Sequence, residues 1–260
     1  MSAAFPGVVV LEDAAAVARE GAARFVALAR AACAARGAFH VALSGGKTPA
    51  ALFRMLAAED LRRSVDWNKT HLYWSDERTV PPSHPDSNYG MAERELIAPL
   101  HIPAQNVHRM EAERADADRA AQEYEALLRK TLPAGPGGFP CFDLIYLGMG
   151  PDGHTASLFP GSSGLTETLK AVIVHDVVPP NFPPCKRMTF TFPLLNAARV
   201  VIFLVTGADK TEKLREVLDG SHTPPYPSQG VRPSAGERIF LVDRAAAGGL
   251  SAGAGARPRT

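Results

Sequence analysis

The chain has 260 residues, enough for one large α/β domain or two small ones with a sizeable core. Its formal net charge of +1 gives no reason to expect a nucleic-acid or membrane-surface partner. The three cysteines, Cys33, Cys141 and Cys185, lack metal-ligand spacing and would leave one over from any disulfide, which favours a reducing compartment. The sequence shows neither a signal-peptide pattern nor an apolar run of transmembrane length, so we expect a soluble cytoplasmic protein.

Short apolar or β-branched runs alternate with longer amphipathic segments along most of the chain. This alternation predicts an α/β fold with a mostly parallel sheet and helices on both of its faces. We expect a single domain over 1–244 and a disordered Ala/Gly-rich tail over 245–260. In chain order we expect a strand at 8–11, a helix at 14–36, a strand at 39–43, a helix at 50–57, a strand at 71–75, a helix at 88–100, a short strand at 106–108, a helix at 114–130, and strands at 142–147, 171–178, 187–192 and 199–205, then a helix from 209 to 218 and a last strand at 238–242.

The turn at 44–49, Ser-Gly-Gly-Lys-Thr-Pro, lies between a predicted strand and a predicted helix. That arrangement places backbone N–H groups and a helix N-terminus around an anion. A nucleotide P-loop would need a glycine at position 41, where this chain has Val41. We therefore expect Ser44, Gly45, Gly46 and Lys47 to bind a phosphate group, and the alternative is an ordinary tight turn that caps the helix.

Two further charged segments also follow predicted strands. Asp76, Glu77 and Arg78 come directly after the strand at 71–75, and Lys210 lies in the first turn of the helix that follows 199–205. A lysine there opposes the helix dipole, so it suits an anionic ligand better than helix stability. Ligands of α/β sheets bind beyond the C-terminal ends of the strands, which favours one shared site. Taken singly, the triplet could be a solvated loop and the lysine a surface residue.

The glycine-rich segment 148–154 follows the apolar run at 142–147. Its glycines match the G-x-G-x-x-G dinucleotide fingerprint, but Pro160-Gly161 prevents the long helix that this fingerprint requires. Asp152 and His154 flank the last of these glycines. A carboxylate and an imidazole on such a loop are suited to proton transfer, so we expect His154 to act as a catalytic base.

Four longer motifs together resemble a known family: ALSGGKTPAALF at 42–53, WSDERTVPPSHPDSNYGMA at 74–92, DLIYLGMGPDGHTASLFPGS at 143–162, and RMTFTFPLLNAARVVIFLVTGADKTEKL at 187–214. From about residue 8 to residue 242, the chain resembles the glucosamine-6-phosphate isomerase/6-phosphogluconolactonase family. The resemblance implies a Rossmann-like α/β fold without a metal or organic cofactor. It also implies hydrolysis of 6-phospho-D-glucono-1,5-lactone to 6-phosphogluconate in the oxidative pentose phosphate pathway.

The same resemblance implies a role for each candidate residue. His154 looks like the base that activates water, and Asp152 like its orienting partner. Residues 44–46 resemble the family's sugar-phosphate loop, Arg78 and Lys210 match its phosphate ligands, and Arg187 is a further match. The substrate-binding candidates are Ser44, Gly45, Gly46, Lys47, Asp76, Arg78, Gly150, Arg187 and Lys210. The expected partner is a small sugar-phosphate lactone, and the expected state is a monomer or a weak homo-oligomer.

Three other functions compete with the lactonase. An amino-sugar-phosphate isomerase/deaminase would share the phosphate loop and Lys210, but the related deaminases have an Asn-Glu pair where this chain continues through Ser157 to Pro160. A non-catalytic sugar-phosphate regulator would lack the base, and this chain retains His154. A serine esterase would need a G-x-S-x-G elbow, which does not occur in this sequence.

Overall fold

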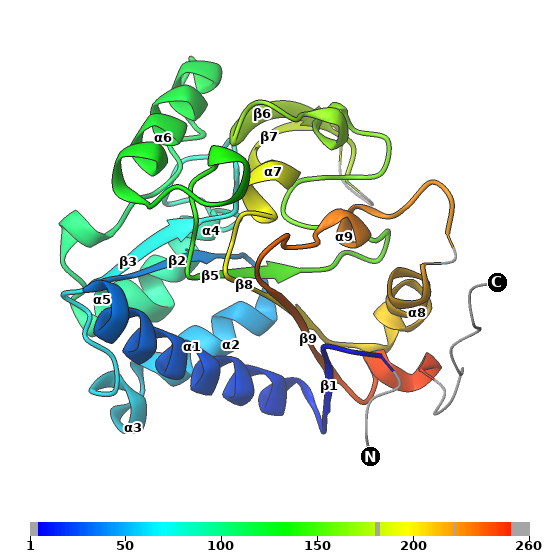
Figure 1. The fold of residues 1–260 in the computed structure, drawn as a ribbon, viewed down its shortest axis with the longest axis horizontal. Helices are drawn as coiled ribbons and strands as arrows, with labels where there is room; N and C mark the ends of the chain where they lie inside the picture. The colour runs from blue at the N-terminus through cyan, green and yellow to red at the C-terminus, as the bar shows by residue number, and fades with distance from the viewer. Residues whose placement is uncertain (1–4, 180–182, 221, 251–260) are drawn as a thin grey trace.

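The computed structural model describes residues 5–179, 183–220 and 222–250 and has two sheets (Figure 1). The main sheet has six strands in the order β1-β9-β8-β5-β2-β3, and all of its pairings are parallel. The predicted α/β fold with a mostly parallel sheet is therefore confirmed. The strands are β1 (Val8–Leu11), β2 (Phe39–Leu43), β3 (Thr70–Trp74), β5 (Leu144–Gly148), β8 (Val200–Val205) and β9 (Glu237–Asp243).

A second, small sheet has three antiparallel strands in the order β4-β7-β6. Its strands are β4 (Asp76–Arg78), β6 (Val172–Val177) and β7 (Cys185–Phe190). The sequence did not predict a separate sheet. A parallel pair needs a crossover of a dozen or more residues, so the short connection between β6 and β7 permits only antiparallel pairing.

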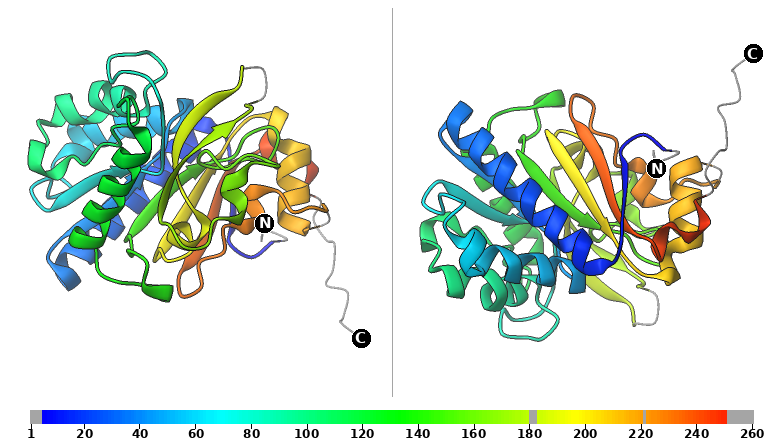
Figure 2. Two further views of the ribbon diagram at one scale, coloured as in Figure 1. Left: turned by 90° about the horizontal axis from the view of Figure 1, so that it is seen from above. Right: turned by 90° about the horizontal axis from the view of Figure 1, so that it is seen from below.

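Different elements pack on the two faces of the main sheet (Figures 1 and 2). Helices α1 and α2 pack on one face, where Phe25 of α1 meets Phe39 of β2 edge to face with ring centroids 5.2 Å apart. The small sheet and α6 cover the other face, where Phe142 packs on Phe190. The helices are α1 (Ala14–Arg36), α2 (Lys47–Ala57), α3 (Glu59–Arg62), α4 (Asn88–Ala92), a π-helix (Glu93–Ile97), α5 (Ala98–Leu100), α6 (Ala117–Thr131), α7 (Phe192–Leu195), α8 (Thr211–Asp219) and α9 (Pro227–Gly230), with short 3₁₀ helices at Ala104–Asn106, Pro136–Gly138, Ser163–Thr166, Ala208–Lys210 and Ala246–Gly249.

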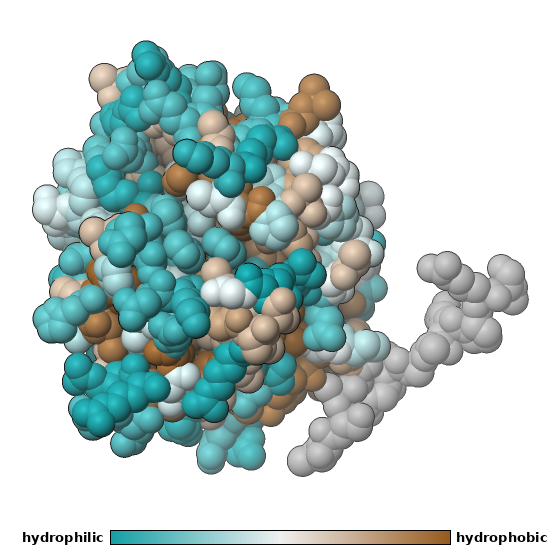
Figure 3. Space-filling view, turned by 60° about the vertical axis from the view of Figure 1, so that its left-hand side comes forward, coloured by the Kyte–Doolittle hydropathy of each residue, from teal (hydrophilic) through white to brown (hydrophobic). Residues whose placement is uncertain are grey.

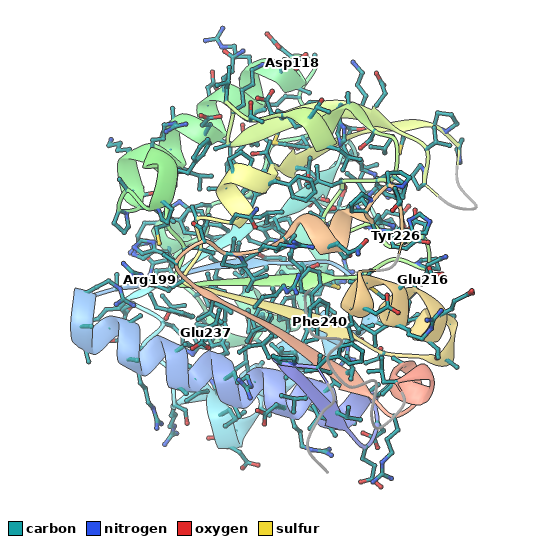
Figure 4. All side chains as sticks on the ribbon, turned by 45° about the vertical axis from the view of Figure 1, so that its right-hand side comes forward. Asp118, Arg199, Glu216, Tyr226, Glu237 and Phe240 are labelled. Carbon is teal, nitrogen blue, oxygen red and sulfur yellow. The ribbon has the colours of Figure 1, made fainter. Side chains whose placement is uncertain are left out.

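The interior of the main sheet is apolar on both faces, as expected for parallel strands covered by other elements. In β8, the side chains from Val201 to Val205 are all buried. Phe203 of β8 stacks on Phe240 of β9 with ring centroids 4.5 Å apart, in the middle of the molecule (Figure 4). The core thus holds the strands rigidly and leaves their C-terminal ends to carry polar loops.

Helix α1 has the predicted bounds because both of its ends are marked by local sequence signals. The side chain of Asp13 accepts a hydrogen bond from the N–H of Ala16 at 2.7 Å, and Gly37 takes the left-handed conformation that ends the helix. Helix α2 begins at Lys47, three residues before its predicted start. Gly46 turns the chain with a φ of 112°, so Pro49 falls in the first turn, where an N–H would lack a helical partner anyway.

Several other predicted elements differ from the structure. Asp116 caps α6, which begins at Ala117 instead of residue 114, and the expected strand at 106–108 is only a single bridge between Val107 and Leu72. The predicted tail at 245–260 begins with packed structure, because a 3₁₀ helix covers Ala246–Gly249 and Ala246 is fully buried. Residues 251–260 lie outside the described residues.

Candidate functional site

The topology brings the predicted polar segments to one edge of the main sheet. Strands β8, β5, β2 and β3 are consecutive neighbours and run parallel, so their C-terminal ends lie side by side. The segments 206–210, 148–154, 44–48 and 76–78 follow these four strands directly. This edge is where α/β sheets bind their ligands.

A cavity of about 190 Å³ lies at this edge, and we refer to it as the site cavity. It brings together the glycine turn after β2, the start of β4 and the glycine loop after β5. Its lining residues are Ser44, Gly45, Gly46, Asp76, Arg78, Asn88, Gly148, Met149, Gly150, His154 and Ala156. A larger cavity of about 600 Å³ beside α6 contains none of the predicted site residues.

His154 and Asp152 form a pair at the wall of the site cavity. The imidazole Nδ1 lies 2.5 Å from Oδ1 of Asp152, and the His154 ring stacks on Phe159 with centroids 4.1 Å apart. Partial burial alone would raise the pKa of Asp152, but the hydrogen bond and the charge of His154 outweigh it and lower that pKa. An ionised carboxylate only accepts hydrogen bonds, so in the neutral form of the ring Nδ1 carries the proton and Nε2 keeps a lone pair that can accept another.

The glycine loop allows this pair to form. A Cβ on Gly150 would lie 2.0 Å from Nδ1 of His154 and 2.6 Å from Oδ1 of Asp152, so only glycine leaves room for the two side chains. Gly153 has a φ of 78°, and a Cβ there would lie 2.7 Å from the ring of Tyr226. Both glycines are therefore required by the placement of His154.

Hydrogen bonds from the segment 226–228 hold the loop from outside. The Ser228 hydroxyl donates to the carbonyl of Gly153 at 2.9 Å and lies 3.3 Å from the carbonyl of His154. The Tyr226 hydroxyl donates to the Glu216 carboxylate at 2.8 Å, and both side chains project from neighbouring elements at one end of the molecule (Figure 4). The imidazole is thus held on a loop that is tied to the rest of the chain.

The triplet Asp76-Glu77-Arg78 is strand β4 and not the solvated loop that was its alternative interpretation. Glu77 is 3% exposed and accepts hydrogen bonds from the backbone N–H groups of Arg78, Asn88 and Tyr89 and from the Ser87 hydroxyl. Burial raises the pKa of Glu77, and the backbone hydrogen bonds oppose that rise. This carboxylate binds β4 to the start of α4 and so fixes the residues on either side of it.

Four predicted site residues lie outside the lining of the site cavity. Asp152 lies next to it through its contact with His154. Lys47 is exposed at the first position of α2, and Lys210 forms an ion pair with Asp209 at 2.8 Å. Arg187 is the direct cross-strand partner of Arg78 in the pairing of β4 and β7, and its Nε donates to Sγ of Cys185 at 3.4 Å.

Asn88 is a lining residue that the sequence interpretation missed. Its Nδ2 donates to the backbone carbonyl of Asp76 at 2.9 Å, and a Cβ on Gly45 would lie 1.8 Å from its Oδ1. Asn88 therefore contacts both the phosphate-loop candidate and β4. The available signal was its place at the first turn of a helix, directly after Ser87, whose hydroxyl caps α4.

The described residues contain no group of three or more His, Cys, Asp or Glu side chains placed to hold a metal ion. Nor do they include a helix that is both long and apolar enough to span a membrane. The face in Figure 3 is largely hydrophilic with scattered hydrophobic residues.

Comparison with known proteins identifies the family. A sequence model of the glucosamine-6-phosphate isomerases/6-phosphogluconolactonase family matches residues 12–240. A 6-phosphogluconolactonase of Synechocystis sp. is 43% identical over 216 residues, which cover 83% of this chain and 86% of the relative. A 6-phosphogluconolactonase of Nostoc sp. is 41% identical over 217 residues, which cover 83% of this chain and 86% of the relative.

A solved structure agrees with the sequence relatives. The 6-phosphogluconolactonase of Trypanosoma brucei superposes with a TM-score of 0.84 at 30% sequence identity, covering 95% of this chain and 100% of the other. The family match spans the motifs at 42–53, 74–92 and 143–162 that form the site cavity. The chain belongs to the glucosamine-6-phosphate isomerase/6-phosphogluconolactonase family.

Proposed function

We propose that this protein hydrolyses 6-phospho-D-glucono-1,5-lactone to 6-phospho-D-gluconate, with His154 as the general base. The observation that carries the proposal is the pairing of His154 with Asp152 at the wall of a cavity beside Arg78, in which Nε2 has no hydrogen-bond partner among the described residues. The curated relatives at 43% and 41% identity are 6-phosphogluconolactonases, which supports this substrate class. We assign this reaction to the cytoplasm and to the oxidative pentose phosphate pathway.

The reaction needs only proton transfer and charge stabilisation. Nε2 of His154 takes a proton from water as the water oxygen attacks C1 of the lactone, and Asp152 stabilises the resulting imidazolium. Negative charge develops on the carbonyl oxygen and requires hydrogen-bond donors, for which the loop 148–154 offers backbone N–H groups other than those of Gly150, Gly153 and His154, which bond within the loop. The C1–O5 bond then breaks, and the leaving ring oxygen takes the proton from the imidazolium, which restores the neutral base.

The phosphate group is held at a distance from the reacting carbon. Gly46 leads into α2 without a side-chain cap, so the first N–H groups of this 11-residue helix are available to an anion. Arg78 lines the site cavity, and its cross-strand partner Arg187 adds a second guanidinium on the same side of the small sheet. Lys47 and Lys210 follow the ends of β2 and β8, and we assign them to the same phosphate, for which Lys210 would leave its ion pair with Asp209. Binding at a distance orients C1 against the base and lowers the entropic part of the barrier.

A pH-stat assay with freshly made 6-phosphogluconolactone tests the proposal. The wild-type protein is expected to release acid far faster than the spontaneous hydrolysis measured in the same buffer, and His154→Asn is expected to approach the spontaneous rate. Glucosamine 6-phosphate in a parallel ammonia assay tests the amino-sugar alternative. Acid release no faster than the buffer control would refute the lactonase, and release of ammonia would replace it with the deaminase.

A further inference from the structure

His175 is a buried histidine on β6 to which the proposed mechanism gives no role. It is 7% exposed, lies on an edge strand of the small sheet and is not a lining residue of the site cavity. Both of its ring nitrogens form hydrogen bonds with the segment 155–164, which continues the chain directly after His154. His175 therefore ties the chain that follows the proposed base to the small sheet.

Each ring nitrogen of His175 has a different partner, and the two partners define where the proton lies. The backbone N–H of Gly164 donates to Nδ1 at 3.2 Å, and Nε2 lies 2.8 Å from the backbone carbonyl oxygen of Ser157. An N–H group only donates and a carbonyl only accepts, so Nδ1 keeps its lone pair, Nε2 carries the proton and the ring is neutral. Burial lowers the pKa of His175, which favours the same neutral form, although the Ser157 carbonyl and the charge of Asp176 oppose that change.

The two backbone groups that His175 bonds have no replacement partner. Gly164 lies in the first turn of a short 3₁₀ helix, where an N–H finds no helical acceptor. Among the described residues, His175 is the only donor to the carbonyl of Ser157, which is 1% exposed. A Cβ on Gly164 would lie 2.8 Å from Cε1 of His175, so this backbone packs directly on the ring. Because an unpaired buried backbone group is unfavourable, loss of the imidazole would displace the chain at both points.

The segment between these two points carries the ring that contacts the base. Phe159 is 5% exposed and stacks on the imidazole of His154 with ring centroids 4.1 Å apart. Ala156 has a φ of 48°, which is uncommon for a residue with a side chain. Such a backbone conformation persists only where surrounding contacts hold it. The bond from His175 to Ser157, the next residue, is one of these contacts.

We propose that His175 is a positioning residue for the base, because its two hydrogen bonds hold the segment 157–164 so that Phe159 orients the imidazole of His154. This inference rests on the proposed function, since it gives His175 a part in the same reaction. The phosphate group is held elsewhere, at the start of α2 and on β4. Loss of His175 is therefore expected to lower kcat while the affinity for the product is kept.

Three substitutions separate the two hydrogen bonds of His175. His175→Phe keeps a flat ring and removes both bonds, His175→Gln places an amide nitrogen near the position of Nε2, and His175→Asn places an amide oxygen near the position of Nδ1. His175→Phe is expected to lower kcat about 10-fold or more and to change the Kd of 6-phosphogluconate less than about twofold, since a small misplacement of a catalytic group is costly. His175→Gln is expected to recover most of the loss, because it can still donate to Ser157, and His175→Asn is expected to recover less.

The matched control is Asp176→Asn, which changes the next residue of β6. Asp176 is exposed and points to the opposite face of the strand, so this variant is expected to keep the wild-type kcat and product affinity. Thermal unfolding of each variant identifies a folding defect. Wild-type kcat in a folded His175→Phe protein, or equal losses of kcat and of product affinity, would overturn the inference. If His175→Phe does not fold, the two amide variants carry the test, and equal kcat values for them would overturn it.

A double-mutant cycle tests whether His175 acts through Phe159. Kinetics are measured for His175→Phe, Phe159→Leu and the protein with both changes. If the two residues act on the base in series, the double variant is expected to lose no more kcat than the more impaired single variant. Losses that multiply would mean that His175 affects turnover by another route, and they would overturn the inference.

The proposed function can fail separately, if the wild type does not accelerate hydrolysis of the lactone. Nitrogen NMR of the imidazole rings then tests the inference without turnover. His175 is expected to carry its proton on Nε2, and the signals of His154 are expected to shift in His175→Phe and to return toward their wild-type positions in His175→Gln. A proton on Nδ1 of His175, or His154 signals that His175→Phe leaves unchanged, would overturn the inference.

Discussion

Arg78 of β4 and Arg187 of β7 are direct cross-strand partners in the antiparallel small sheet. Two like charges in this position destabilise a sheet by up to about 1 kcal/mol, so the pair is unfavourable for folding alone. Arg78 lines the site cavity, and its Nη1 donates to the carbonyl of Asp86. An anion bound between the two guanidinium groups would remove the repulsion.

The first prediction is therefore that replacing Arg187 weakens ligand binding without lowering the stability of the ligand-free protein. Arg187→Gln is expected to unfold at the same temperature as the wild type or higher without ligand. With 6-phosphogluconate at 100 times its Kd, the wild type gains about 2.7 kcal/mol of stability, and a variant that binds tenfold more weakly gains about 1.4 kcal/mol. Calorimetric melting with and without the ligand measures both quantities.

The control for this prediction is Arg63→Gln, because the Arg63 side chain is 87% exposed and lies far along the chain from either strand. It is expected to leave the gain from the ligand unchanged. If Arg187→Gln keeps the full gain as well, Arg187 has no part in anion binding and Arg78 acts without it.

The second prediction concerns the base. His154→Asn keeps much of the size of the side chain but cannot take a proton, so kcat is expected to fall roughly 10²- to 10⁴-fold. Asp152→Asn is expected to lower kcat less, because it changes only the orientation and stabilisation of the imidazole. Both variants are expected to bind 6-phosphogluconate as well as the wild type, since the phosphate is held elsewhere. Turnover near the wild-type level by a folded His154→Asn protein would exclude His154 from the mechanism.

The sequence predicted the elements whose signals are local. Asp13 and Gly37 mark the two ends of α1, and the apolar run before Gly148 marks the central strand. The same holds for the site loops, because each one directly follows a strand of the parallel sheet. Once the strands were identified, the shared edge followed from topology alone.

The sequence did not predict what depends on distant contacts. Asp76, Glu77 and Arg78 have the composition of a solvated loop, yet the backbone N–H groups of Asn88 and Tyr89 satisfy Glu77 and allow burial. Asn88 belongs to the site because of its packing against Gly45, which lies 43 positions earlier in the chain. No pattern within a short stretch of sequence encodes such a pairing.

The third prediction is a loss of stability in acid. His40, His71 and His108 stack in a row beside Tyr73, and Nδ1 of His71 lies 3.2 Å from Nε2 of His108. Burial and the neighbouring imidazoles lower the pKa of both His40 and His108 to about 4, with Asp143 opposing the change at His40. Burial also lowers the pKa of His71.

The direction of the change in stability with pH follows from the protons that the chain takes up when it unfolds. Unfolded histidines bind protons below about pH 6.5, whereas these folded ones do so only nearer pH 4, so unfolding takes up protons in between. The stability that these lowered pKa values contribute is fully present above about pH 6.5 and is lost as the pH falls toward 4. Denaturant melts across this range measure it. His108→Gln is expected to flatten the pH dependence, and the same change at the more exposed His84 is expected to leave it intact; equal slopes for all three proteins would contradict the prediction.

The last prediction compares two glycines of the same loop. Gly148 lines the site cavity and a Cβ on it would meet no atom within 4 Å, whereas a Cβ on Gly150 would collide with the paired side chains of His154 and Asp152. Gly148→Ala is therefore expected to raise KM by occupying ligand space while the base stays in place. Gly150→Ala is expected to lower kcat at least 10-fold by displacing the imidazole, with a smaller effect on the affinity for 6-phosphogluconate. Steady-state kinetics and product binding for the two variants separate the effects. If Gly150→Ala changed only KM, the space that Gly150 leaves for the His154–Asp152 pair would have no role in turnover.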